Sequence, residues 1–292
     1  MFIYKFIHLP LLKVFPILNF HHFKNDIVSI EIIILALLIG ISLGLIGGGG
    51  SILTVPVLVY VAGISPVMAT AYSLFIVGGT SLVGAFNYFN KKLVHIPTAL
   101  VFSIPSLTSV YLVRRYVIPL LPDTVFTIGG FAVTKSIFIM VLFASIMFFA
   151  ALSMIWNKNQ EADNDDISKI SFNYPLIFGE GLLIGALTGF VGAGGGFLII
   201  PALVMFAKLP MRLAIGTSLL IIAIKSLIGF TGDVHNIAVI DWSLLGIFTA
   251  VASGGIFIGS SIGKKVDANS LKKIFGWFVL VMAVYILFKE LL

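Results

Sequence analysis

The sequence predicts an all-α membrane protein: a polytopic helix bundle of two inverted-topology repeats with glycine-broken short helices. The first observation is composition, because 59% of the 292 residues are hydrophobic and only 10% are charged. A soluble domain usually carries about 25% charged residues on its solvated surface. The second observation is the length of the apolar runs, and the third is an internal repeat. In lipid every backbone polar group is paired internally, which leaves helices or closed barrels. The runs are too long and unbroken for the alternating strands of a barrel.

The apolar runs give the elements in chain order. Runs close to the roughly 20 residues that a spanning helix needs occur at 27–46, 68–89, 96–113, 136–156, 175–191, 213–232, 239–263 and 274–288. Two shorter runs, at 51–62 and 197–207, each follow a glycine cluster. They would reach only about 16–20 Å, short of a hydrocarbon core of about 30 Å. Each contains a proline, Pro56 or Pro201, which we interpret as a structural or hinge position.

The chain divides into four predicted segments. Residues 1–26 are apolar but interrupted by lysines and prolines, and we interpret them as an interfacial segment, with a signal peptide as the alternative. Residues 27–156 form the first repeat and residues 175–292 the second. Residues 157–174 include the one long polar stretch, typical of a solvated linker.

The repeat is visible when the chain is shifted by 145 residues against itself. Leu37–Gly84 then aligns with Leu182–Gly229 without a gap, with 20 identities in 48 positions. Each unit reads as a helix, a glycine break, a short helix and three further helices. Internal similarity of this kind indicates duplication of one structural unit.

Loop charges favour opposite orientations of the two units, because short cytoplasmic loops are rich in Lys and Arg. Lys91 and Lys92 follow the second long run, whereas the equivalent loop of the second unit carries Asp233 and Asp241. The loop after the short helix shows the reverse bias, uncharged in the first unit and basic in the second. This scheme requires the two helices around each glycine cluster to form a hairpin. It also places Arg114, Arg115 and Lys24 outside, against the usual bias.

The glycine clusters are the predicted substrate-binding site. A break at membrane depth exposes the N–H groups and positive dipole end of the following half-helix, and glycine lets an anion approach them closely. Gly-interrupted segments at matching positions of two repeats are the best sequence indication of a transporter's site. Close helix packing is the alternative, and we favour it for the pairs Gly40/Gly44 and Gly185/Gly189. The predicted binding residues of the clusters are Gly47, Gly48, Gly49, Gly50, Ser51, Gly192, Gly194, Gly195 and Gly196.

The helices that follow carry further candidates. Ser73 and Thr80 lie on one, and Thr217 and Ser218 on the other. Isolated hydroxyls in membrane helices often bond to their own backbone, so a structural role stays open for each. Lys225 lies inside an apolar run, where a charge costs at least about 2.5–3.5 kcal/mol and normally faces a pore, a partner or a ligand. We predict that it lines an anion path, with snorkelling or a pair with Asp233 as alternatives.

Other classes of function find little support. No Gly-Lys-Ser/Thr follows either cluster, so the clusters do not form a nucleotide-binding loop. The net charge of +6 resides in short loops, which is typical of membrane orientation and not of nucleic-acid binding. The sequence contains no cysteine, and its five histidines show no metal-ligand spacing. We therefore expect no catalytic residue, metal or cofactor, and a small anion and membrane lipid as partners. The oligomeric state stays open.

The motifs GLIGGGGSILTVPVL and GFVGAGGGFLIIPAL, followed by ATAYSL and AIGTSL, resemble the sulfite exporter TauE/SafE family. The likeness extends from about residue 27 to residue 290. It implies a multi-pass inner-membrane transporter of two related halves that exports sulfite or a sulfur-containing organic anion. It also implies site residues within Gly47–Ser51, Gly192–Gly196, Ser73 and Thr217–Ser218, whereas Lys225, Arg114 and Arg115 look atypical. An ion-coupled importer of organic anions and an anion channel are the alternative functions.

Overall fold

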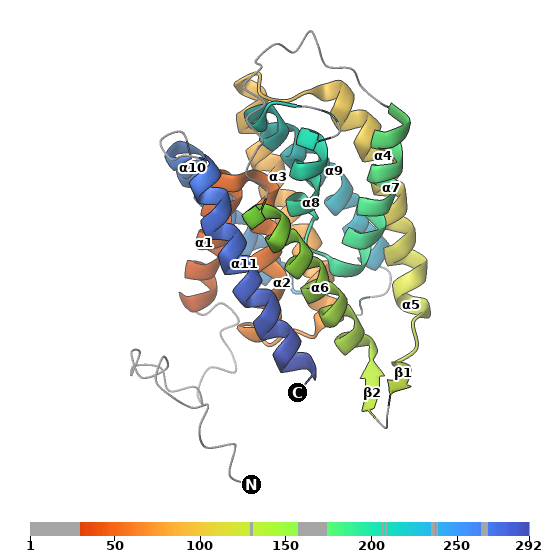
Figure 1. Ribbon diagram of the computed structural model, residues 1–292. Coiled ribbons are helices and arrows are strands. Elements are labelled where there is room, and N and C mark those ends of the chain that lie inside the picture. Colours follow the sequence, from red (N-terminus) through yellow and green to blue (C-terminus); the bar gives the residue numbers. More distant parts are fainter. Residues whose placement is uncertain are drawn as a thin grey trace.

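The computed structural model describes residues 30–128, 131–156, 174–205, 207, 209–234, 237, 239–263 and 268–291. It is a bundle of helices with one small hairpin of strands (Figure 1), which confirms the predicted all-α membrane class. The predicted interfacial segment 1–26 and nearly all of the linker 157–174 lie outside these residues. The boundaries assigned to the four segments stay predictions.

The first repeat follows the predicted order of elements. Its helices are α1 (Ile30–Ile46), the 3-10 helix η3 (Gly47–Leu53), α2 (Thr54–Tyr60), α3 (Pro66–Asn90), α4 (Ile96–Leu112), the π-helical turn η4 (Val113–Val117), α5 (Ile118–Leu120) and α6 (Lys135–Trp156). An antiparallel hairpin of β1 (Thr124–Ile128) and β2 (Phe131–Thr134) precedes α6. This hairpin was not predicted, although two β-rich runs around Gly-Gly are a hairpin signal.

The second repeat has the same order without the hairpin. Its helices are α7 (Tyr174–Val191), α8 (Gly196–Met205), α9 (Met211–Val234), α10 (Trp242–Ile262) and α11 (Ala268–Leu291). Within the described ranges, 7 helical stretches are long and apolar enough to cross a membrane, counting Ile30–Tyr60 as one stretch, and Pro175–Val191 is a shorter apolar helix.

The chain turns back on itself at each glycine cluster. A Cβ atom on Gly50 would lie 2.5 Å from the Leu43 nitrogen and 2.6 Å from the Ser42 carbonyl carbon. Residues eight apart in a straight helix are separated by about 12 Å, so α1 and α2 form a hairpin. In the second repeat, a Cβ on Gly195 would lie 3.1 Å from the Thr188 Cβ. The helices α7 and α8 therefore form the equivalent hairpin, as the loop charges require.

Equivalent helices of the two repeats run in opposite directions. Along the interface of α3 with α9, Gly78 packs on Leu227 and Gly84 packs on Leu219, so the helices are antiparallel. Because α3 and α9 are the same element of the duplicated unit, the repeats have inverted topology. Each hairpin also packs on the other repeat, with α1 along α10 and α7 along α4 (Figure 1).

The Gly-x-x-x-Gly pairs bring these crossed helices into backbone contact. A side chain on Gly40 would overlap the Ala252 carbonyl, and one on Gly44 would lie 2.7 Å from the Ser260 nitrogen. A side chain on Gly185 would overlap the backbone of Ser106. Close helix approach is the expected use of this motif in a membrane, so the packing interpretation fits these positions.

The two ends of the bundle differ in charge. Lys91 and Lys92 follow α3, and Arg212 lies at the start of the neighbouring α9, where Gly216 packs on the Leu93 backbone. All three basic residues are exposed, and we call this end of the bundle the basic face. Asp233 and Asp241 lie at the opposite end of α9 and at the start of α10. Lys208, Lys264 and Lys265 fall outside the described residues.

Replacing Gly185 with valine is expected to destabilise the fold. The added side chain would overlap Ser106 at the interface of α7 with α4, and overpacking typically costs about 1–3 kcal/mol. At Gly179 of the same helix, an added Cβ would have no neighbouring atom within 4 Å, which makes Gly179→Val the matched control. Thermal unfolding in detergent should show a lower midpoint for Gly185→Val alone. Equal midpoints would contradict the described packing of α7 on α4.

Single cysteines should report the orientation, because the natural sequence has none. Asn90 at the end of α3 and Asp123 after α5 are both exposed and lie on opposite faces. The positive-inside rule predicts a cytoplasmic basic face. A membrane-impermeant maleimide should therefore label Asp123→Cys in intact cells, and Asn90→Cys only after permeabilisation. Labelling of both from one side would contradict the topology, and the reverse pattern would contradict the orientation.

Candidate substrate-binding site

The two glycine clusters meet at the centre of the bundle. A Cβ on Gly48 would overlap the Gly196 Cα, and a Cβ on Gly196 would overlap the Gly48 backbone. Ile222 of α9 packs against Gly48, and Val77 of α3 packs against Gly194. These two residues are equivalent in the repeat. Each cluster therefore packs against the same position of the long helix in the other half.

The clusters have different backbone conformations. Each begins with a left-handed glycine, Gly47 with φ of 68° and Gly192 with φ of 71°. In the second cluster Gly194 and Gly195 are also left-handed, and α8 begins only at Gly196. Left-handed geometry at three positions is accessible to glycine and costly for other residues. The second cluster is therefore an open turn between two helices.

The first cluster continues as a helix instead. Gly47–Leu53 is a 3-10 helix that leads directly into α2. The Ser51 hydroxyl donates to the Gly48 carbonyl at 2.7 Å, a side-chain bond within this 3-10 helix. The expectation of two equivalent exposed half-helix starts is thus wrong for the first cluster. Gly196, the equivalent of Ser51, has no hydroxyl to make such a bond.

Lys225 lies against the second cluster. Its side chain is 0% exposed, and its Nζ donates to Thr188 Oγ1 at 3.1 Å. A Cβ on Gly195 would lie 3.0 Å from this Nζ. Snorkelling is therefore excluded, because the ammonium points inward. In the part of the chain that the structure describes, Asp233 forms its ion pair with Arg114 and not with Lys225.

Several hydroxyls of the short helix α2 and of the long helices α3 and α9 are buried without a hydrogen-bond partner in the described residues. Within the described ranges these include Thr54, Ser73, Thr80, Ser81 and Ser226. A Cβ on Gly194 would lie 3.5 Å from Ser226 Oγ. Buried hydroxyls usually have partners, and an unpaired one costs about 1–3 kcal/mol. Of these hydroxyls, the Ser226 hydroxyl lies beside the second cluster and is available to a ligand there.

A buried ion pair lies near the second cluster, toward the end of the bundle opposite the basic face. Arg114, in the π-helical turn η4, is 0% exposed, and its Nη1 lies 3.3 Å from Asp233 Oδ2. The same Nη1 donates to Thr70 Oγ1 at 3.1 Å. A Cβ on Gly192 would lie 2.5 Å from the Thr70 Cα. Arg114 was not predicted as a site residue, because the expected helix ended at residue 113.

The family is decided by comparison with known proteins. The family model described as sulfite exporter TauE/SafE matches residues 32–286. This chain belongs to the TauE/SafE family. It is similar to a probable membrane transporter protein of Xylella fastidiosa strain 9a5c, with 28% identity over 87% of this chain and 92% of the relative. The probable membrane transporter protein YunE of Bacillus subtilis is 26% identical over 82% of this chain and 90% of its own length. No solved structure matches the chain.

Two other predicted site residues of this TauE/SafE protein, Thr217 and Ser218, use their hydroxyls in hydrogen bonds to the backbone. Thr217 Oγ1 accepts from the His95 backbone N–H at 2.9 Å, which ties the start of α4 to α9. Ser218 Oγ donates to the Ile215 carbonyl at 2.8 Å. These side chains are buried in the site region but engaged in structural bonds. Their assignment as substrate ligands stays a prediction, as it does for the other site residues.

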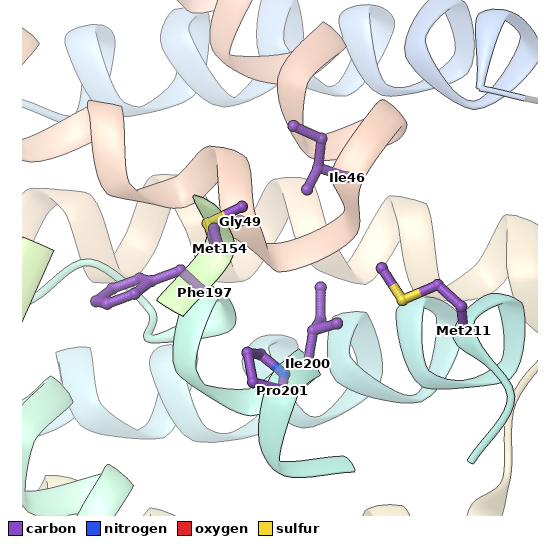
Figure 2. A pocket seen from close by; sticks show the side chains of 7 residues that line it. All are labelled: Ile46, Gly49, Met154, Phe197, Ile200, Pro201 and Met211. Atoms are coloured by element: carbon purple, nitrogen blue, oxygen red, sulfur yellow. The ribbon is translucent and has the colours of Figure 1, made fainter. Parts of the chain in front are cut away.

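A small apolar cavity lies beside the first cluster (Figure 2). Its volume is about 30 Å³, room for at most a few water molecules. Pro201 of α8 lines it, whereas Pro56 is buried in α2. Met154 ends α6 and Met211 begins α9, so these side chains lie on the side of the basic face. The cavity is lined by Ile46, Gly49, Met154, Phe197, Ile200, Pro201 and Met211.

Two acidic residues in the early turns of α7 and α1 lie away from the glycine clusters. Glu180 lines a groove of about 600 Å³ between α7 and α8, among apolar side chains such as Leu183 and Leu198. Glu31 is in the first turn of α1. Neither belongs to the residues that surround the contact of Gly48 with Gly196.

Replacing Gly195 with alanine should disturb the site beyond the cost of its backbone. Gly195 and Gly63 have similar φ values of 64° and 68°, so alanine pays about 1–2 kcal/mol of left-handed strain at either. Only at Gly195 would the new Cβ meet Thr188 and Lys225, since Gly63 has open space around it. Thermal unfolding in detergent should therefore show the larger loss for Gly195→Ala. Equal losses would mean that these contacts relax freely.

Proposed function

We propose that this TauE/SafE protein is a secondary transporter, and not an enzyme, that exports a small anion across the cytoplasmic membrane. The proposed substrate is sulfite or a sulfur-containing organic anion, as the family description suggests. The observation that carries the proposal is the position of Lys225, buried at the second glycine cluster without a carboxylate partner in the described residues.

The electrostatics of this position favour an anion. A charged lysine at membrane depth costs at least about 2.5–3.5 kcal/mol, and a bound anion offsets much of this cost. The first turn of α8 adds its N–H groups and positive dipole end at Gly196. Ser226 adds a hydroxyl beside Gly194. Cation, helix start and hydroxyl together form a site for a small oxyanion.

The inverted repeats supply a mechanism of alternating access. Transporters with such repeats expose one central site to each face in turn by rocking one part against the other. In this structure Met154 and Met211 line the apolar cavity beside Gly49 (Figure 2), and both lie toward the basic-face ends of their helices. We infer that these side chains part when the site opens toward that face. Pro56 and Pro201 lie in the short helices that would bend.

Membrane potential favours the proposed direction. With a negative cell interior, each unit of negative charge that leaves gains about 2.3 kcal/mol per 100 mV. Export of an anion through the site therefore needs no obligatory coupling ion. Import against this potential would need one, which gives the direction a measurable signature.

Replacing Lys225 with alanine should reduce anion efflux at least about tenfold, because the charge that offsets desolvation of the substrate is lost. Proteoliposomes loaded with sulfite, sulfate, thiosulfate or a sulfonate would measure this flux. Lys273→Ala is the matched control, since Lys273 is an exposed residue of α11.

Three outcomes would contradict parts of the proposal. Sulfite flux equal to that of empty liposomes would exclude sulfite, and flux of none of the four anions would exclude the anion exporter. Wild-type flux in Lys225→Ala would exclude the role of Lys225. Flux that does not saturate, or that requires a Na⁺ gradient, would favour a channel or a coupled importer.

A further inference from the structure

Arg114 has hydrogen-bonding capacity that the protein does not use. Its guanidinium is fully buried, yet a single nitrogen, Nη1, makes both of its contacts, with Asp233 and Thr70. Among the residues that the structure describes, Nε and Nη2 have no hydrogen-bond partner. A guanidinium carries five N–H groups in a fixed fork and cannot lose its proton in a protein. Most of the N–H groups of the Arg114 guanidinium are therefore buried and unpaired in the described structure.

The position of this fork relates it to the central site. Arg114 contacts Thr70, whose backbone packs on Gly192, the first residue of the second cluster. The Gly192 N–H donates to the Thr188 carbonyl at 2.8 Å, and Thr188 accepts from Lys225. Both buried cations are thus linked to the same turn, Lys225 directly at Gly195 and Arg114 through Thr70 at Gly192.

A purely structural ion pair is a poor explanation of these contacts. A buried pair offsets its desolvation only when the geometry is good and the remaining donors are satisfied. Here the pair uses one nitrogen at 3.3 Å, and the fork is left open. In the equivalent helix pair, α10 with α3, a neutral bond from Asn87 Nδ2 to Ser260 Oγ at 3.3 Å is sufficient. Packing of these helices therefore does not require charge.

We propose that Arg114 is a second anion-binding station on the transport path, at the end opposite the basic face, with Asp233 as its intramolecular competitor. The carboxylate occupies the guanidinium when the station holds no substrate, and the passing anion displaces it. The open fork suits an anion with two or three oxygens on one centre, such as sulfite or a sulfonate. This inference rests on the proposed function, since it needs an anion that reaches the path.

The test compares Arg114→Gln/Asp233→Asn with Asp233→Asn alone, in anion binding and in proteoliposome flux. The double variant keeps a neutral polar pair, so it avoids leaving Asp233 as an unpaired buried charge, the defect expected of Arg114→Gln alone. Asp233→Asn removes the competitor and should bind sulfite at least about threefold more tightly, with slower turnover. The double variant should keep the wild-type unfolding midpoint but raise the KM of transport at least about tenfold. Arg115→Gln is the control, a neighbouring arginine that is only half-buried.

The outcomes separate this inference from the proposed function. Wild-type KM and turnover in the double variant would overturn the station while Lys225→Ala could still abolish flux. A lower unfolding midpoint with unchanged KM in Asp233→Asn would likewise show a structural pair only. Absence of flux for every anion in the wild-type protein would overturn the transporter itself.

Discussion

The backbone contact between Gly48 and Gly196 sets the geometry of the whole bundle. No Cβ fits at either position, so both hairpins can reach the centre only because these residues are glycine. The contact fixes how deeply α2 and α8 enter, and it places Gly194 and Gly195 beside α9. The close crossings of α1 with α10 and of α7 with α4 hold the hairpins from outside. A lysine inside α9 becomes part of a site because the second cluster is held against it.

The helices of the two halves are arranged nearly symmetrically, but the side chains around the two glycine clusters differ. Three substitutions between equivalent positions account for the difference: Ser51 against Gly196, Thr80 against Lys225, and Leu43 against Thr188. In the first half the serine hydroxyl bonds within a 3-10 helix, and the neutral Thr80 takes the position of the lysine. In the second half the turn stays open, and the lysine with its threonine faces it. On the proposed mechanism, inverted symmetry serves the motion of the halves, whereas the proposed binding groups come mainly from the second half.

The sequence predicted those features that depend on neighbouring residues along the chain or on the internal repeat. The helices follow from apolar runs, since α3, α6 and α10 begin and end within about three residues of their predicted ranges. The hairpins follow from loop charges together with the repeat. The use of individual hydroxyls could not be predicted, because Ser51 and Thr217 have partners that only the folded backbone supplies. Arg114 escaped detection for a related reason, since its partner Asp233 lies on another helix of the opposite repeat. The loop-charge scheme placed Arg114 outside, against the usual bias, and this exception was the one sequence feature that suggested its burial.

A transport path with two buried cations needs a means of releasing the bound anion. Binding must be strong enough to draw an anion from water and weak enough to let it leave. Lys225 and Arg114 together would hold an oxyanion firmly in a medium of low dielectric constant. On the proposed path Asp233 weakens the net binding of the anion, because its carboxylate pairs with the Arg114 guanidinium again as the anion departs. The free energy lost by the leaving substrate is then partly returned within the protein. A neutral residue at this position could separate two helices equally well but could not compete for the cation, which is why, on this proposal, the charge of Asp233 matters to transport and not only to packing.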